Sequence, residues 1–156
     1  MEGLTTEQTV AVSAVAGSLL ATIIVGCIIF YVLTVIASWK IFTKAGEEGW
    51  KALIPIYNVY ILYKISNLSF VYWFIIPVVV SGVLSGIGGS FDNEALKNLF
   101  TLAGSVVEIV MLAKFSSALA KAFGKGTGFA VGLFFFPNIF QLILGFGSAK
   151  YVGNKN

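Results

Sequence analysis

The sequence contains no histidine and no arginine, and all ten of its basic residues are lysines. Histidine is the commonest metal ligand and the usual general acid or base, so its absence disfavours most metal and acid–base chemistry. Without arginine the chain lacks the planar group that contacts phosphates and base edges in a bidentate manner. We therefore expect no metal, no cofactor and no nucleic-acid partner.

Cysteine is also nearly absent, since Cys27 is the only one and lies inside an apolar run. A single thiol forms neither an intrachain disulfide nor a zinc site. We interpret Cys27 as a small packing or lipid-facing residue, and a redox or acylation role is the less favoured alternative.

Charged side chains make up only 11% of the 156 residues, whereas hydrophobic residues make up 58%. A soluble domain carries about 25% charged residues because its surface must face water. Most of this surface must therefore face lipid. The composition predicts an integral membrane protein, organised as one membrane domain over residues 1–156.

Four long stretches with few or no charges predict transmembrane helices. We expect them at about residues 18–39, 68–88, 99–119 and 126–149. The predicted fold class is an all-α integral membrane protein with four transmembrane helices and one short cytoplasmic interfacial or re-entrant helix.

The distribution of lysines predicts the orientation. Lys97, Lys150 and Lys155 lie on one side of the predicted spans, together with four acidic residues. The other seven flank the two remaining loops: Lys40, Lys44, Lys51, Lys64, Lys114, Lys121 and Lys125. By the positive-inside rule these loops face the cytoplasm and both termini lie outside, although the two lysines of the tail argue against it.

The segment WKALIPIYNVYILYK, residues 50–64, is apolar but too short to cross a bilayer. Its uncharged part, residues 52–63, would form a helix of about 18 Å, against a hydrocarbon core of about 30 Å. Trp50 and the tyrosines favour the headgroup level, and Pro55 suits a first helical turn. We predict an interfacial or shallow re-entrant helix. The alternative is that the segment extends the second span.

Two motifs, KAGEEGWKALIPIYN (44–58) and AFGKGTGF (122–129), resemble a bacterial family of small, uncharacterised multi-pass membrane proteins. That family shares the patterns KAGxxGWKxxIPIYN and AFGKGxGF, and some members carry the automated name signal peptidase I. The resemblance covers roughly residues 41–151. It implies a location in the bacterial cytoplasmic membrane and no established activity.

The protease name raises the question of serine–lysine catalysis. Ser117 lies three residues after Lys114 and four before Lys121, so a hydrogen bond between hydroxyl and amine is within reach on a helix. The sequence contains no sheet domain to hold an extended substrate, and a basic stripe of snorkelling lysines explains the same spacing. We therefore do not expect an enzyme.

The glycine-rich second motif is not a P-loop, because Lys125 is followed by glycine and not by a hydroxyl residue. Its backbone N–H groups could bind an anion such as a lipid headgroup. The alternative is a helix stop and tight turn. We predict one partner-binding or lipid-binding surface made of both motif loops, with Lys44, Trp50, Tyr57, Asn58, Lys121, Gly124, Lys125, Gly126 and Gly128.

Glu108 falls near the midplane of the third predicted span, where an ionisable group is costly and usually functional. Asn138 and Gln141 lie at similar depth in the fourth span, and Pro77 and Pro137 predict helix breaks in the second and fourth. These are ingredients of a midplane ion or proton site. Alternatively, a protonated Glu108 hydrogen-bonds Asn138 or Gln141 to join two helices.

The function predicted from the sequence is a small membrane subunit or adaptor whose cytoplasmic motif loops dock a protein partner or anionic lipid. The alternative is a small transporter or channel that uses Glu108. A membrane-bound hydrolase is the weakest candidate. The expected partners are the lipid bilayer, an anionic lipid, and a second protein or further copies of the chain.

Overall fold

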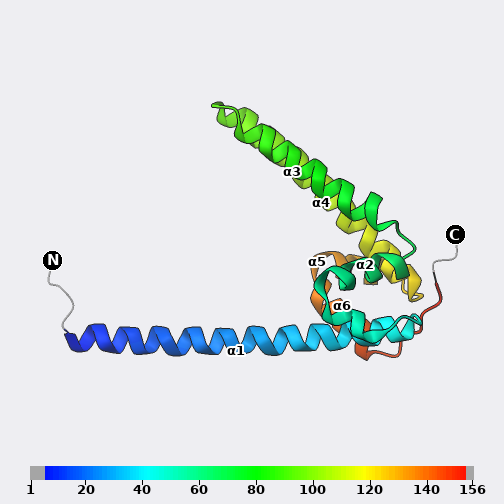
Figure 1. The fold of residues 1–156 in the computed structure, drawn as a ribbon, viewed down its shortest axis with the longest axis horizontal. Helices are drawn as coiled ribbons and strands as arrows, with labels where there is room; N and C mark the ends of the chain where they lie inside the picture. Colours follow the sequence, from blue (N-terminus) through cyan, green and yellow to red (C-terminus); the bar gives the residue numbers. More distant parts are fainter. Residues whose placement is uncertain (1–5, 154–156) are drawn as a thin grey trace.

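The computed structural model describes residues 6–153, and this part of the chain is helical, without a β-strand (Figure 1). Lys155, counted above, lies outside the described residues. A 3-10 helix (η1, Gly49–Leu53) and a π-helical turn (η2, Val71–Ile75) accompany the α-helices. The α-helices are α1 (Thr6–Lys44), α2 (Pro55–Ile65), α3 (Ile76–Gly89), α4 (Glu94–Ala122), α5 (Thr127–Phe135) and α6 (Pro137–Phe146).

The helices form a compact base from which two arms extend (Figure 1). We call residues 37–65 and 114–153 the base, that is, the end of α1, η1, α2, the end of α4, α5, α6 and the segments that join and follow them. One arm is the rest of α1, and the other is α3 paired with the rest of α4. Phe42, Ile61, Leu119, Leu133 and Leu144 are fully buried in the base.

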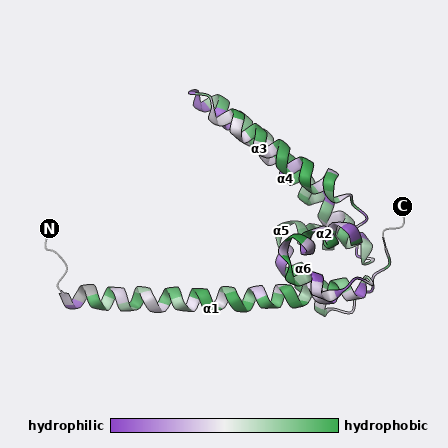
Figure 2. Cartoon of the chain, viewed as in Figure 1, coloured by the Kyte–Doolittle hydropathy of each residue, from purple (hydrophilic) through white to green (hydrophobic). Residues whose placement is uncertain are grey.

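Three helical segments are long and apolar enough to cross a membrane: Val10–Lys44, Val71–Gly89 and Glu94–Ala122. They correspond to the first three predicted spans, although the second begins at Val71 and not at residue 68. The first helix extends beyond the predicted 18–39 in both directions, because the uncharged sequence before it is helical too. Green, apolar residues follow α1 along most of its length in Figure 2, as expected for a helix surrounded by lipid.

The fourth predicted span, residues 126–149, is not a continuous helix. The chain leaves helical geometry at Phe136 (φ −132°, ψ 61°), directly before Pro137. Proline has no N–H to donate and its ring crowds the preceding turn, so the helix stops there. Helices α5 and α6 have 9 and 10 residues. Each is about 15 Å long or shorter, half of a bilayer core of about 30 Å.

Helices α5 and α6 fold back on each other as a hairpin. The rings of Phe129 and Phe140 lie 5.0 Å apart, centroid to centroid, although eleven residues separate them in the sequence. The Phe140 ring also occupies the place that a side chain at position 132 would need, so this fold requires Gly132. We call this pair the α5–α6 hairpin.

The segment after the α5–α6 hairpin returns to the base. The N–H of Val152 donates to the carbonyl of Ala122 (2.9 Å), and the Tyr151 hydroxyl donates to the carbonyl of Ile65 (3.0 Å). The Tyr151 ring packs edge-on against Phe123, with 5.4 Å between centroids. The hairpin thus begins and ends at the same end of the molecule.

Pro77 does not interrupt its helix. A π-helical turn precedes it, in which the N–H of Ile76 donates to the carbonyl of Val71. This wider turn accommodates the proline, and the helix continues through α3.

Helix α2 is separate from α3, which excludes the alternative that residues 52–63 extend the second span. It begins at Pro55, as expected for the first helical turn, and ends at Ile65. Asn67 then adopts a positive φ of 55°, and its N–H donates to the carbonyl of Lys64 (3.0 Å). The N–H of Leu68 donates to Tyr63 (3.0 Å), which closes the helix end.

Candidate lipid and partner surface

The first motif forms the end of α1. Gly46 has a φ of +79°, in the left-handed region that favours glycine. Its N–H donates to the carbonyl of Thr43 (3.2 Å), and the N–H of Glu47 donates to Phe42 (2.9 Å). These two bonds are a Schellman motif, which satisfies carbonyls that a helix end leaves free.

The second motif forms the end of α4 in the same way. Gly124 has a φ of +63° and donates to the carbonyl of Lys121 (2.9 Å), while the N–H of Lys125 donates to Ala120 (2.9 Å). The helix-stop alternative therefore describes the loop geometry. Because these two N–H groups are used in the cap, anion binding by the loop is left to Gly126 and Gly128, at the beginning of α5.

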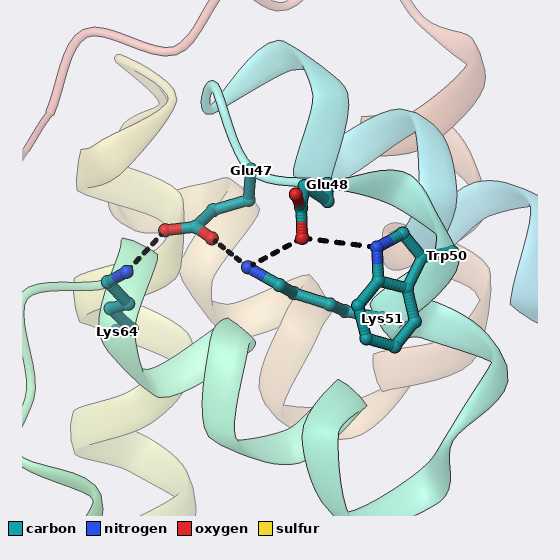
Figure 3. A network of polar contacts seen from close by, with 5 residues as sticks. All are labelled: Glu47, Glu48, Trp50, Lys51 and Lys64. Atoms are coloured by element: carbon teal, nitrogen blue, oxygen red, sulfur yellow. Dashed lines mark hydrogen bonds and ion pairs between the residues drawn. The ribbon is translucent and has the colours of Figure 1, made fainter.

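Four charged residues of the first motif and α2 form one polar network with Trp50 (Figure 3). Glu47 accepts hydrogen bonds from Lys64 (2.6 Å) and Lys51 (3.0 Å). Glu48 accepts from the Trp50 indole N–H (3.1 Å) and also pairs with Lys51 (3.4 Å). The network ties the loop after α1 to both η1 and α2.

The network shifts two pKa values. The hydrogen bond from Lys64, with a further one from Lys51, holds the pKa of Glu47 below its ordinary value. The hydrogen bond to Glu47 raises the pKa of Lys51. Burial raises the pKa of the nearby Tyr63 hydroxyl to about 12. All three groups keep their neutral-pH protonation states, so the network is structural at physiological pH.

Two of the predicted binding residues contact the protein itself. The Lys44 ammonium donates to the carbonyls of Leu144 and Gly147, both at 2.7 Å, and so caps the end of α6. The Asn58 side chain donates to the carbonyl of Ala52 (3.2 Å) and joins η1 to α2. Both side chains hold the base together.

Other predicted binding residues remain open at the surface. Trp50 and Tyr57 are exposed, with ring centroids 6.2 Å apart. Tyr60 continues this row of rings to Phe70, at 5.7 Å. A groove of about 340 Å³ is lined by Ile56, Tyr57, Tyr60 and Phe70.

Lysines are strongly concentrated in the base. The base carries only two acidic residues, Glu47 and Glu48, which leaves six positive charges in excess. Within residues 6–153, only Lys51 and Lys64 of the base lysines pair with a carboxylate. The eight base lysines are Lys40, Lys44, Lys51, Lys64, Lys114, Lys121, Lys125 and Lys150.

The far end of the α3–α4 arm has the opposite balance. Asp92 and Glu94 lie there with a single lysine, Lys97, which pairs with Glu94 at 2.8 Å. The two ends of the molecule therefore differ in the sign of their charge.

The members of the predicted midplane site lie on different helices. Glu108 accepts a hydrogen bond from the hydroxyl of Ser81 (3.1 Å), which joins α4 to α3. Asn138 and Gln141 lie on α6, and no hydrogen bond among the described residues joins either of them to Glu108. Sequence reasoning missed Ser81. The available signal was a hydroxyl one helical turn after Pro77 in a neighbouring span.

The serine–lysine pair is not formed either. No hydrogen bond in the described part of the chain joins Ser117 to Lys114 or Lys121. The Lys114 ammonium lies over the Trp73 ring, 5.5 Å from its centroid, and Lys125 lies over Phe129 at 5.9 Å. These lysines are placed as snorkelling side chains at an apolar surface.

The fold defines an all-helical protein with three helices suited to crossing a membrane and a compact, lysine-rich base. The comparison with protein families then identifies its family. The chain belongs to a family of unknown function (DUF5684), whose profile matches residues 50–154. The matched region begins at Trp50 in the first motif and includes the whole second motif. Neither a curated protein nor a solved structure matches the chain.

Proposed function

We propose that this protein is a small, non-enzymatic membrane subunit or adaptor whose base docks anionic lipid or the acidic segment of a partner protein. The observation that carries the proposal is the excess of six positive charges in the base. Anionic lipids attract lysines near the membrane surface by about 1 kcal/mol each.

The proposal includes a topology of three spans and one re-entrant hairpin. The hydrogen bond from Val152 to Ala122 supports a tail on the same side as both motif loops, with the N-terminus opposite. Lys150 then joins the seven lysines of the motif side, and Lys97 alone faces the other. The positive-inside rule favours a cytoplasmic base. The resemblance of the motifs to a bacterial family supports a location in the bacterial plasma membrane.

The surface of the α5–α6 hairpin supports its insertion into lipid. Most of its exposed side chains are large and apolar, with the polar Thr127 and Asn138 as exceptions, and Phe135 and Phe136 at the turn are 67% and 59% exposed. Val131, Ile139 and Ile143 are exposed as well. Such a surface is stable in the hydrocarbon of one leaflet and costly in water.

The docking surface itself consists of Lys121 and Lys125 together with the exposed aromatic residues Trp50 and Tyr57. Lys121 lies in the last turn of α4 and Lys125 in the loop after it, and Trp50 and Tyr57 supply rings suited to the headgroup level. An anionic headgroup would meet the lysines while the rings lie among the glycerol groups. An acidic peptide would use the same charges.

Retention of phosphatidylglycerol by the purified protein tests the docking surface. The variant Lys121→Gln/Lys125→Gln should retain several-fold less of this lipid than the wild-type chain. Lys97→Gln, at the far end of the α3–α4 arm, is the control and should retain the wild-type amount. Undiminished retention in the double variant, together with no stoichiometric protein partner in native mass spectrometry, would refute the proposal.

A transporter or channel is the second candidate. The observation that favours it is the break at Pro137, because discontinuous helices at membrane depth often form substrate or ion sites. Among the described residues no hydrogen bond joins Glu108 to α6, which weighs against a transport site. Ion flux in proteoliposomes decides: loss of flux in Glu108→Gln, with Glu94→Gln unaffected, would favour transport over docking.

A further inference from the structure

A second apolar groove lies along the part of α1 next to η1. Its volume is about 540 Å³. It is lined by one face of α1 between Tyr31 and Lys40, with Val32 and Val35 among the aliphatic side chains, and by Leu53 of η1. Apart from Lys40, every side chain of the lining is apolar or aromatic.

The groove runs from the base toward the bilayer centre. Tyr31 and Lys40 are nine residues apart on a continuous α-helix, which corresponds to about 14 Å. This length is close to half of a hydrocarbon core of about 30 Å, that is, to one leaflet. The groove therefore has the depth of a single acyl chain that begins at the headgroup level.

The base end of the groove carries an unneutralised positive charge. Lys40 is exposed, its ammonium lies 4.5 Å from the centroid of the Phe146 ring, and no carboxylate of the described residues pairs with it. Trp39, next to it, packs against Gly49, where a side chain would overlap the indole. This contact fixes the ring at the mouth of the groove.

Glycine at position 49 thus explains how η1 comes close enough to α1 for Leu53 to form one wall. The first motif would then have a second role, because its turn builds the wall of the groove. The groove is open along α1, so its natural occupant comes from the surrounding leaflet.

We infer that this groove binds one anionic phospholipid, with an acyl chain between α1 and Leu53 and the phosphate beside Lys40. The inference rests on the proposed membrane orientation and deepens the proposed lipid docking by naming a single site. It differs in its residues from the docking surface at Lys121 and Lys125, so the two can fail separately.

Quenching of Trp39 fluorescence by phospholipids with brominated acyl chains tests the site. The full chain carrying Trp50→Phe and Trp73→Phe retains Trp39 as its only tryptophan. In mixed micelles, brominated phosphatidylglycerol should quench Trp39 saturably, at about one-fifth of the mole fraction that brominated phosphatidylcholine requires. This fivefold preference corresponds to ~1 kcal/mol.

Two variant pairs separate charge from shape. Lys40→Gln should abolish the fivefold preference, whereas Lys150→Gln should keep it. Val32→Phe, which fills part of the groove, should weaken quenching by both lipids, whereas Val25→Phe should not. Val25 lies on the same helix, is 55% exposed and does not line the groove. Circular dichroism of every variant verifies that it is folded.

Each outcome has a definite meaning. Equal quenching by the two lipids, or a preference that survives Lys40→Gln, overturns the anionic headgroup. Quenching that rises linearly with lipid and ignores Val32→Phe overturns the groove as a site. Loss of phosphatidylglycerol retention in Lys121→Gln/Lys125→Gln with unchanged Trp39 quenching leaves the groove standing as a separate site. Undiminished phosphatidylglycerol retention in that double variant, together with saturable Trp39 quenching that depends on Lys40, supports the groove alone.

Discussion

The base and the arms are built from similarly apolar sequence, yet they use it differently. Helix α4 passes through both, so it allows a direct comparison. Leu119 in the base is 0% exposed, whereas Leu102 in the arm is 64% exposed. The base buries many of its apolar side chains against its own helices, whereas the arms present most of theirs to the surroundings. Hydropathy alone does not distinguish a protein core from a lipid-facing surface.

Glycine is used differently in the two regions as well. At Gly145 an added Cβ would lie 2.6 Å from the carbonyl oxygen of Ala37, so α6 and α1 approach closely there. At Gly82 and Gly86 in the arm, an added Cβ would meet nothing within 4 Å. The base thus depends on a close backbone contact at Gly145, and the arm has room for larger side chains at positions 82 and 86.

The largest predicted effect compares the two leucines of α4. Leu119→Ala should reduce the free energy of unfolding by about 2–5 kcal/mol, because it leaves a cavity in the core of the base. Leu102→Ala should change it by no more than ~0.5 kcal/mol. Titration with sodium dodecyl sulfate, which unfolds both variants in mixed detergent micelles, measures the difference in their free energies of unfolding. Equal effects would remove the distinction between base and arm.

The second comparison uses two helical glycines. Gly145→Ala should destabilise the protein by about 1–3 kcal/mol, because the new methyl group overlaps the α1 backbone at Ala37. Gly86→Ala should be neutral or stabilise the arm by up to ~1 kcal/mol, through the better helix propensity of alanine. The same titration measures both. A stable Gly145→Ala variant would show that α1 and α6 are not in contact.

The third comparison concerns the return of the chain after α6. Tyr151→Phe should lower stability by about 1 kcal/mol, because the carbonyl of Ile65 loses its hydrogen bond from the hydroxyl. Tyr72→Phe, in η2 and 69% exposed, is the matched control and should have no effect. Amide hydrogen exchange of residues 147–153 should rise in the first variant only. Unchanged exchange would indicate that the tail is held by other contacts.

The smallest predicted effect is a pH dependence confined to the base. The folded pKa of Glu47 is depressed, so its ion pairs contribute stability above its unfolded pKa, about 4.3, and lose it as the pH falls through the folded value. Stability of the base should therefore decline below about pH 4. Glu47→Gln should remove up to ~1 kcal/mol of this dependence, and Glu94→Gln in the exposed arm pair should not. Identical acid profiles for the wild-type chain and Glu47→Gln would contradict the role of the network.

Much of the fold could be predicted from local sequence properties. Long uncharged runs predicted three helices of spanning length, and Pro55 predicted the beginning of α2. The pattern at Pro137 predicted a break but not the fold-back. The reversal depends on the Phe140 ring lying against Gly132, a contact between residues that no local pattern connects. For this reason residues 126–149 were expected to cross the membrane once.

The candidate site could be predicted only in part. Exposed rings and cations such as Tyr57 and Lys125 followed from composition and spacing. The inward role of Lys44 could not be predicted, because its partners lie about a hundred residues later in the chain. The roles of Tyr151 and Ser81 likewise depend on which helices pack together. Long-range packing decides which polar residues are free to bind and which hold the fold.

The side of the membrane on which residue 148 lies tests the central claim most directly. In a Cys27→Ser background, single cysteines at Glu48, Asp92 and Ser148 would be probed in intact cells with a membrane-impermeant maleimide. The proposed three-span topology predicts that Asp92→Cys is labelled from outside, while Glu48→Cys and Ser148→Cys are labelled only after the membrane is opened. Labelling of Ser148→Cys together with Asp92→Cys would contradict the re-entrant hairpin and restore a fourth span.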